Sequence, residues 1–235
     1  MSNLFTFEYL ENQFDEAIKF GYEFLTCIDF VERKKTLGDK SIIMRVDIDE
    51  SVSKANRLLD IFGSRDIKAT FFLRLHAEYN PFSFSNFAVI RRIIDEGHEL
   101  GYHSEIIDQS AIWGINPIQC LRTDLMTMSV IFGIKIQGVA SHCGNTGLNN
   151  LDFWKTHKPK DFDLAYEAYD QEDTFNLFHD SLYLSDSEWT QWKAYVDGQL
   201  RANDRRSLVE HLRDEPRRVY LLIHPETYFD RDPNA

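Results

Sequence analysis

The sequence has 235 residues, of which 43% are hydrophobic, and this size and composition predict one globular domain with a large core and exclude an intrinsically disordered chain. The 38 acidic residues outnumber the 26 Lys and Arg, which gives a net charge of −12 and argues against general binding to nucleic acid or anionic lipid. No apolar run is long enough for a membrane span, and the first residues lack the pattern of a signal peptide. We therefore expect a cytoplasmic protein without an integral membrane segment.

The three cysteines, Cys27, Cys120 and Cys143, are odd in number and far apart. They form no CxxC pair, so the sequence predicts neither a disulfide framework nor a thiolate zinc site. Cys143 directly follows His142, and one interpretation is a nucleophile with its base. The alternative, a packing role, is the commoner one for a lone cysteine.

The N-terminal segment shows helical periodicity. Apolar side chains recur at spacings of three and four from Phe14 to Ile28, which predicts an amphipathic helix ending near Lys35 and an N-terminal helical extension over residues 1–38. Further along, apolar runs predict strands at 41–46, 68–75, 98–103 and 134–140, with helices from Ser51 to Phe62, around Ile90 to Ile94, and from Pro117 to near Gly133.

This alternation of strands and helices indicates parallel strands joined by right-handed crossovers, so the fold class is α/β. Downstream the pattern predicts strands at 162–169 and 175–184, helices at 189–201 and 207–213, and a last strand at 219–223. Because no linker or repeat interrupts the chain, we expect residues 1–235 to form a single domain.

Polar side chains recur where the predicted strands end. The carboxyl ends of parallel strands meet at one rim, where ligands bind and catalytic groups converge. The residues at these positions are Asp47 and Asp49, Arg74 and His76, His103, His142, Asp186 and His224.

Aspartate and histidine together are a ligand set suited to zinc, manganese, iron or cobalt. Asp47 and Asp49 lie two residues apart on an extended segment and so point the same way. One can bind a metal while the other acts as a base, and an imidazole across the site can protonate a leaving amine. These residues therefore indicate hydrolysis of an amide bond.

Three segments resemble the polysaccharide deacetylase (NodB homology) superfamily in order and spacing. They are residues 45–49 (Arg-Val-Asp-Ile-Asp), 69–72 (Ala-Thr-Phe-Phe) and 96–103 (Glu-Gly-His-Glu-Leu-Gly-Tyr-His). Two later segments, 183–187 followed by Trp189, and 222–225, resemble the closing motifs of a divergent subgroup tied to surface-polysaccharide (O-antigen) gene clusters. The resemblance covers about residues 42–228.

The resemblance implies a distorted (β/α) barrel of about seven parallel strands and a divalent metal, zinc first among the candidates. It also implies roles for four residues. Asp47 matches the general base, Asp49 and His103 match metal ligands, and His224 matches the histidine that protonates the leaving amine.

The sequence departs from the family at the second histidine ligand. That ligand is expected at position 107, where this chain has Ile107. The candidates to replace it are Glu105, Asp108 and His142, and we favour His142 because it ends its own predicted strand. In the third motif, residues 140–144 (Ala-Ser-His-Cys-Gly) stand where the family has an Arg-Pro-rich turn.

Four residues are further candidates for substrate contacts: Arg74, Glu105, Asp186 and Trp189. Arg74 suits a sugar hydroxyl or carboxylate, although an ion pair with an acidic neighbour is an alternative. For two other histidines we expect no role in catalysis or metal binding. We expect His98 to be packed and hydrogen-bonded in the structure, and His211 to be a solvated surface group.

The leading hypothesis is a metal-dependent hydrolase that removes an acyl group from an N-acylated sugar, such as a nucleotide-linked or lipid-linked precursor of a surface polysaccharide. An inactive barrel that binds carbohydrate or an assembly partner is the main alternative, because Ile107 replaces a ligand. Wide separation of Asp49 and His103 would favour that alternative. A hydrolase of cyclic imides or formamides is a third possibility.

Overall fold

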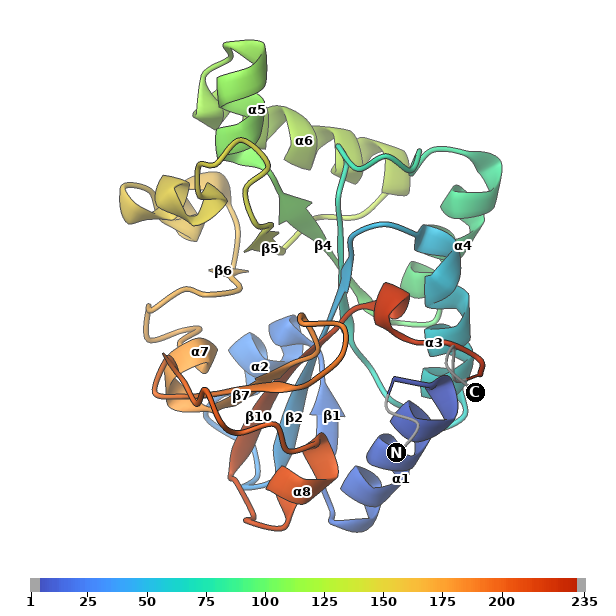
Figure 1. Ribbon diagram of the computed structural model, residues 1–235. Coiled ribbons are helices and arrows are strands. Elements are labelled where there is room, and N and C mark those ends of the chain that lie inside the picture. Colours follow the sequence, from blue (N-terminus) through green and yellow to red (C-terminus); the bar gives the residue numbers. More distant parts are fainter. Residues whose placement is uncertain (1–4, 232–235) are drawn as a thin grey trace.

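The structure is a computed structural model that describes residues 5–231, and it is built around one mostly parallel sheet (Figure 1). The strands pair in the order β6-β5-β4-β3-β2-β10-β7-β8-β9, and β1 pairs with β2 beside this path. Pairs from β6 to β7 along this order are parallel, whereas β8 and β9 are antiparallel additions. The strands are β1 (Glu23–Leu25), β2 (Ser41–Ile48), β3 (Thr70–Leu73), β4 (Glu99–Ser104), β5 (Gly138–Ser141), β6 (Tyr166–Glu167), β7 (Leu182–Ser185), β8 (Lys193–Val196), β9 (Gln199–Leu200) and β10 (Arg218–Ile223).

The helices lie around this sheet, and α1, α3 and α4 lie along one side of it (Figure 1). The α-helices are α1 (Phe7–Lys19), α2 (Cys27–Arg33), α3 (Ala55–Gly63), α4 (Phe84–Asp95), α5 (Ile106–Trp113), α6 (Pro117–Phe132), α7 (Leu177–Asp180) and α8 (Leu208–Leu212). Four 3₁₀ turns complete the set: η1 (Val52–Lys54), η2 (Asn150–Lys155), η3 (Pro159–Phe162) and η4 (Pro225–Thr227). None of the helices within residues 5–231 has the length and apolar character that crossing a bilayer requires.

The predicted α/β class and a run of seven parallel strands are confirmed. Strands β6 and β9 end the sheet, and within residues 5–231 no ladder pairs them. Aromatic rings occupy the region between β6 and β7: Tyr166 stacks on Phe175 with ring centroids 4.4 Å apart, and the hydroxyl groups of Tyr169 and Tyr183 lie 3.3 Å apart. Side chains rather than backbone pairing therefore connect these two strands.

Strand β2 shows how the sheet separates core from site. Its alternate residues Ile42, Met44, Val46 and Ile48 join the larger apolar cluster, which includes side chains of α1, α3 and α4. The residues between them face the opposite side, because successive side chains of a strand alternate in direction. Ile43 joins a second, aromatic-rich cluster there, and Arg45 and Asp47 follow it on the same face toward the carboxyl end.

The amino-terminal end of the barrel is covered by α2, which the sequence did not predict as a separate helix. The predicted single helix ending near Lys35 is wrong: Gly21 adopts a positive φ of 81°, β1 follows, and Thr26 caps α2 through the backbone amide of Asp29. The amide of Ile28 at the start of α2 donates to a carboxylate oxygen of Glu99 at 3.0 Å. The segment is thus tied to the sheet.

The region after β7 contains the largest error of the sequence prediction. Residues 189–201 form the hairpin of β8 and β9 instead of a helix, with Asp197 and Gly198 in the turn at φ of 53° and 69°. Trp192 in this segment is buried against the main core, so its apolar character reflects tertiary contacts rather than the inner face of a helix. The predicted strand at 162–169 shortens to β6, 175–184 divides into α7 and β7, and 134–140 shortens to β5.

The helix predicted at 207–213 is present as α8, but the interpretation of His211 as a solvated surface group is wrong. The residue is only 3% exposed, and its Nε2 lies 3.4 Å from Asp204. The interpretation of His98 is confirmed. Its ring is buried beside Phe62 and Phe71, and Nδ1 accepts the backbone amide of Ala69 at 3.2 Å.

Candidate active site

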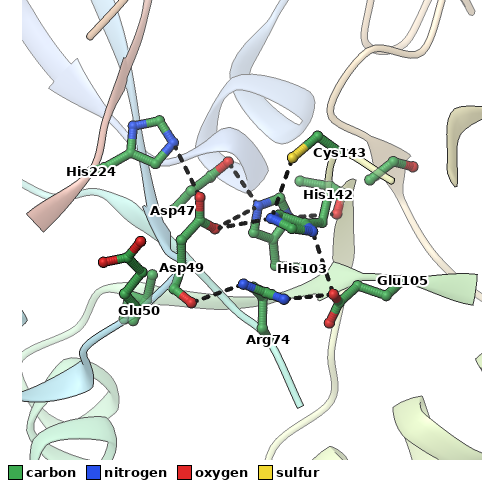
Figure 2. Close-up of polar contacts among 12 residues, drawn as sticks. Asp47, Asp49, Glu50, Arg74, His103, Glu105, His142, Cys143 and His224 are labelled. Atoms are coloured by element: carbon green, nitrogen blue, oxygen red, sulfur yellow. Dashed lines mark hydrogen bonds and ion pairs between the residues drawn. The ribbon is translucent and has the colours of Figure 1, made fainter. Parts of the chain in front are cut away.

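The residues predicted from strand ends converge on one cavity of about 550 Å³ at the carboxyl rim of the sheet. Asp47 and Asp49 come from the end of β2, Arg74 follows β3, and the remaining groups follow β4, β5 and β10. Figure 2 shows the two aspartates between the ring of His224 and the rings of His103 and His142. Seven of the nine predicted site residues line the cavity directly: Asp47, Asp49, Arg74, His103, His142, Trp189 and His224.

Asp49, His103 and His142 form a candidate metal centre in which one ligand atom from each lies within 4.8 Å of the others. Asp49 Oδ1 is 3.2 Å from His103 Nε2 and 3.9 Å from His142 Nε2. The separation of Asp49 and His103 is therefore short, and the wide spacing that would favour an inactive barrel is not observed.

The surroundings of these atoms fit a cation. His103 Nδ1 lies 2.8 Å from the carbonyl oxygen of Ala140, so it carries the hydrogen and leaves the lone pair of Nε2 directed at the aspartates. Asp49 Oδ1 is buried without a hydrogen-bond partner. Although burial raises its pKa, the neighbouring histidines hold the pKa of Asp49 well below its usual range, so the group is an anion. One carboxylate and two imidazoles suit a divalent transition metal such as zinc, manganese, iron or cobalt.

Asp47 is paired with an arginine that the sequence analysis did not select. Arg45 is 1% exposed and donates from Nε and Nη2 to the two carboxylate oxygens at 2.8 and 2.7 Å. Its guanidinium also lies over the rings of Phe72 and Tyr169. Burial raises the pKa of Asp47, but Arg45, His103 and His224 together hold it below its usual value. The spacing of two residues on one strand was the available signal, because it places both side chains on the same face.

His224 forms a pair with Asp186, which follows β7. Its Nδ1 lies 2.6 Å from Asp186 Oδ1, and its backbone amide donates to Oδ2 at 2.9 Å. Burial lowers the pKa of His224, but Asp186 raises it to about 9 in the metal-free protein. Asp186 is 0% exposed, so the geometry favours a role in orienting His224 over the substrate contact that the sequence suggested.

Arg74 and Glu105 form the ion pair that was the alternative to sugar binding. Arg74 Nη2 is 2.7 Å from Glu105 Oε1, and Nη1 donates to the carbonyl oxygen of Asp49 at 3.0 Å. Glu105 Oε1 also accepts Asn145 Nδ2 at 3.0 Å. Burial raises the pKa of Glu105, but His142 and Arg74 lower it to about 2.

The segment around position 107 has a structural task in this chain. Ile107 packs against the larger apolar cluster, and its amide donates to Asn150 Oδ1. The carboxylate of Asp108 accepts the amides of Asn145 and Thr146 at 2.9 and 3.0 Å, so it holds the loop after His142. Asp108 is thereby occupied, and the candidate ligand cluster contains His142 instead.

Aromatic side chains also line the cavity: Tyr169, Phe178, Tyr183, Trp189 and Tyr195. Trp189 is 44% exposed and adopts a φ of 62°. Cys143 is exposed in the same cavity, where its Sγ lies 3.6 Å from His142 Nε2, and this hydrogen bond lowers the pKa of the thiol. The thiol is thus close to a candidate ligand, although the residues are adjacent in sequence.

Fold and site together place a candidate metal cluster at the carboxyl rim of a mostly parallel sheet, between the Arg45–Asp47 and Asp186–His224 pairs. No family model matches the sequence. Over 76 residues the chain is 37% identical to the "Putative polysaccharide deacetylase YheN" of Bacillus subtilis (strain 168). The matched segment is 32% of this chain and only 25% of that relative.

Two solved structures are similar to this chain to different extents. IcaB from Ammonifex degensii superposes with a TM-score of 0.51 at 14% identity, over 68% of this chain and 74% of that one. The deacetylase PplD of Streptococcus pyogenes covers 55% of this chain and 59% of its own, with a TM-score of 0.43 at 14% identity. The likeness to polysaccharide deacetylases that the motifs predicted is confirmed in sequence over the matched segment, and the likeness to IcaB shows a shared fold over 68% of the chain.

Proposed function

We propose that this protein is a divergent polysaccharide-deacetylase-like hydrolase that removes an acyl group from an N-acylated sugar with the help of a divalent metal. The observation that carries the proposal is a spatial one. The Arg45–Asp47 and Asp186–His224 pairs flank the cluster of Asp49, His103 and His142 in a single cavity.

Asp49, His103 and His142 would hold the metal, with zinc the first candidate. When bound, the cation lowers the pKa of a water molecule and polarises the acyl carbonyl. The position of Arg45 then matters, because its bidentate contact keeps Asp47 ionised and fixes the direction of both carboxylate oxygens.

Asp47 and His224 divide the proton transfers between them. Asp47 accepts a proton from the water that attacks the acyl carbonyl, which leaves a tetrahedral carbon with the sugar nitrogen still attached. His224 carries a proton at neutral pH because Asp186 stabilises the imidazolium, and it gives this proton to the nitrogen as the carbon–nitrogen bond breaks. The products are a carboxylic acid and an amino sugar.

The substrate side of the proposal rests on the cavity wall and on the closing motifs. Exposed Trp189 and the neighbouring aromatic rings offer a face on which a sugar ring can stack. The resemblance of residues 183–189 and 222–225 to the subgroup tied to surface-polysaccharide clusters supports a nucleotide-linked or lipid-linked precursor, handled in the cytoplasm.

The test is release of acetate from a panel of N-acetylated sugars and nucleotide sugars by zinc-loaded protein. Asp47→Asn and His224→Asn are each expected to lower kcat by about 10²- to 10⁴-fold. Asp124→Asn is the matched control, because Asp124 is a buried aspartate outside the cavity, on α6. Wild-type turnover in Asp47→Asn would refute the base assignment, and hydrolysis of cyclic imides but no acyl sugar would refute the substrate class.

A further inference from the structure

Glu105 occupies a helix N-cap position without capping the helix. It follows β4 and precedes α5, but its side chain makes no hydrogen bond to the α5 amides. The carboxylate instead turns into the site, where it is 3% exposed (Figure 2). The amides of Ile107 and Asp108 at the start of α5 donate to Asn150 Oδ1, so the helix does not need Glu105 as its cap and the buried carboxylate has another task.

The Glu105 carboxylate faces the imidazole ring of His142. Glu105 Oε1 lies at ion-pair distance, 3.4 Å, from His142 Nδ1, and this buried Nδ1 makes no hydrogen bond to any residue in the described part of the chain. The corresponding nitrogen of His103 is held by the carbonyl oxygen of Ala140. Each candidate histidine ligand thus has one nitrogen toward the metal cluster and the other toward an acceptor oxygen.

Arg74 prevents Glu105 from acting as a ligand itself. Arg74 Nη2 donates to Glu105 Oε1 at 2.7 Å, and Arg74 Nη1 donates to the carbonyl oxygen of Asp49. A fixed guanidinium cation next to that oxygen opposes the approach of a second cation. Asn145, on the loop that carries His142, donates to the same oxygen.

We infer that Glu105 is a positioning residue that fixes the tautomer and ring direction of His142, with Arg74 holding Glu105 in place. This inference rests on the proposed metal site. In this arrangement the segment after β4 supplies no metal ligand at Ile107. It instead orients His142, which follows β5, while Asp108 anchors the loop after His142.

The experiment measures metal binding by the full chain, independently of turnover. Zinc affinity of chelator-treated protein is measured by competition with a chromophoric chelator. We expect Glu105→Ala to weaken binding about 10- to 100-fold and Glu105→Gln, which keeps the volume and an acceptor oxygen, to weaken it less. Glu50→Gln is the control: Glu50 lines the cavity beside Asp49 and bears the same charge, but its side chain makes no contact with His142. Its affinity is expected to stay within about threefold of wild type.

A second readout reports the tautomer directly. Cobalt-substituted wild-type protein should show two exchangeable, hyperfine-shifted N–H proton resonances in the NMR spectrum, one from His103 and one from His142. In Glu105→Ala the second resonance should be lost to exchange while the first remains. Unchanged affinity and both resonances in the Glu105 variants would overturn the positioning role. Unchanged affinity in His142→Asn would instead overturn the proposed metal site, so the two failures are distinguishable.

Discussion

The two ends of strand β4 carry carboxylates in opposite environments. At the amino-terminal end, Glu99 accepts hydrogen bonds from Thr70, Tyr166 and the amide of Ile28, all neutral donors, and burial raises its pKa. At the carboxyl end, Glu105 is an anion beside Arg74, and its Oε2 has no hydrogen-bond partner. At the first, neutral end the carboxylate has only uncharged donors and is satisfied, whereas at the second, charged end it faces a cation and is incompletely paired. We therefore expect the first end to stabilise the sheet and the second to serve the site.

The largest expected effect is at the charged end. Asp49→Ala should abolish stoichiometric metal and lower deacetylation by roughly 10³-fold or more, because the cation supplies several kcal/mol of transition-state stabilisation. The free energy of unfolding of the metal-free protein should fall only slightly, because the variant loses the attraction between Asp49 and the neighbouring histidines but also the cost of burying a carboxylate.

Elemental analysis of protein purified without chelator, together with urea unfolding of the chelated form, measures both effects. His103→Ala should behave in the same way for metal. Metal retained at wild-type stoichiometry in both variants would contradict the assignment.

The neutral end should give the reverse result. Glu99→Ala should lower the free energy of unfolding by about 2–3 kcal/mol, because three donors lose their acceptor and α2 loses its anchor. Zinc affinity should be unchanged. Glu99→Gln keeps one acceptor oxygen and should lower the free energy of unfolding by about half as much. Loss of zinc in either variant while the protein remains folded would contradict the distinction between the two ends.

The smallest effect concerns pH. Burial lowers the pKa of His98, at the same end of β4, to about 4 from an ordinary value of 6.5. Between these values the unfolded chain binds the extra proton, so the contribution of His98 to stability is complete above pH 6.5 and is lost as the pH falls toward 4. The loss between pH 6.5 and 4.5 should be about 2 kcal/mol.

The measurement is the difference in unfolding free energy between wild type and His98→Gln across this range. The variant should be less sensitive to acid than the wild type by that amount. Parallel curves for the two proteins would show that His98 does not titrate in this way.

The parallel half of the fold could be predicted from sequence because each strand there is an apolar run that ends at a polar residue, as Ile43 to Asp47 illustrates. The N-terminal segment could not, since the apolar stripe from Phe14 to Ile28 continues across Gly21 and a short strand. The prediction of a helix at 189–201 was wrong for a related reason. Its apolar residues fit a helical pattern, but Trp192 is buried through tertiary contacts that a local pattern does not contain.

Some site residues could be predicted because an Asp or His at the end of a predicted strand is enough to place the side chain at the rim. Asp49, His103 and His142 were selected on that basis, and their ligand atoms do converge. The supporting residues were harder to predict, because their partners are distant in sequence: Glu105 depends on Arg74 and Asp186 depends on His224. Arg45 was overlooked although it lies on the same face as Asp47.

The position of β10 has a consequence for assembly. This strand lies between β2 and β7, so the site acid His224 reaches Asp49 only when a segment late in the chain is inserted into the middle of the sheet. A fragment without residues 218–223 would expose two unpaired edges of largely buried strands, which are sites for aggregation. Insertion of β10 therefore joins the two parts of the sheet and also brings His224 to Asp186 and Asp49.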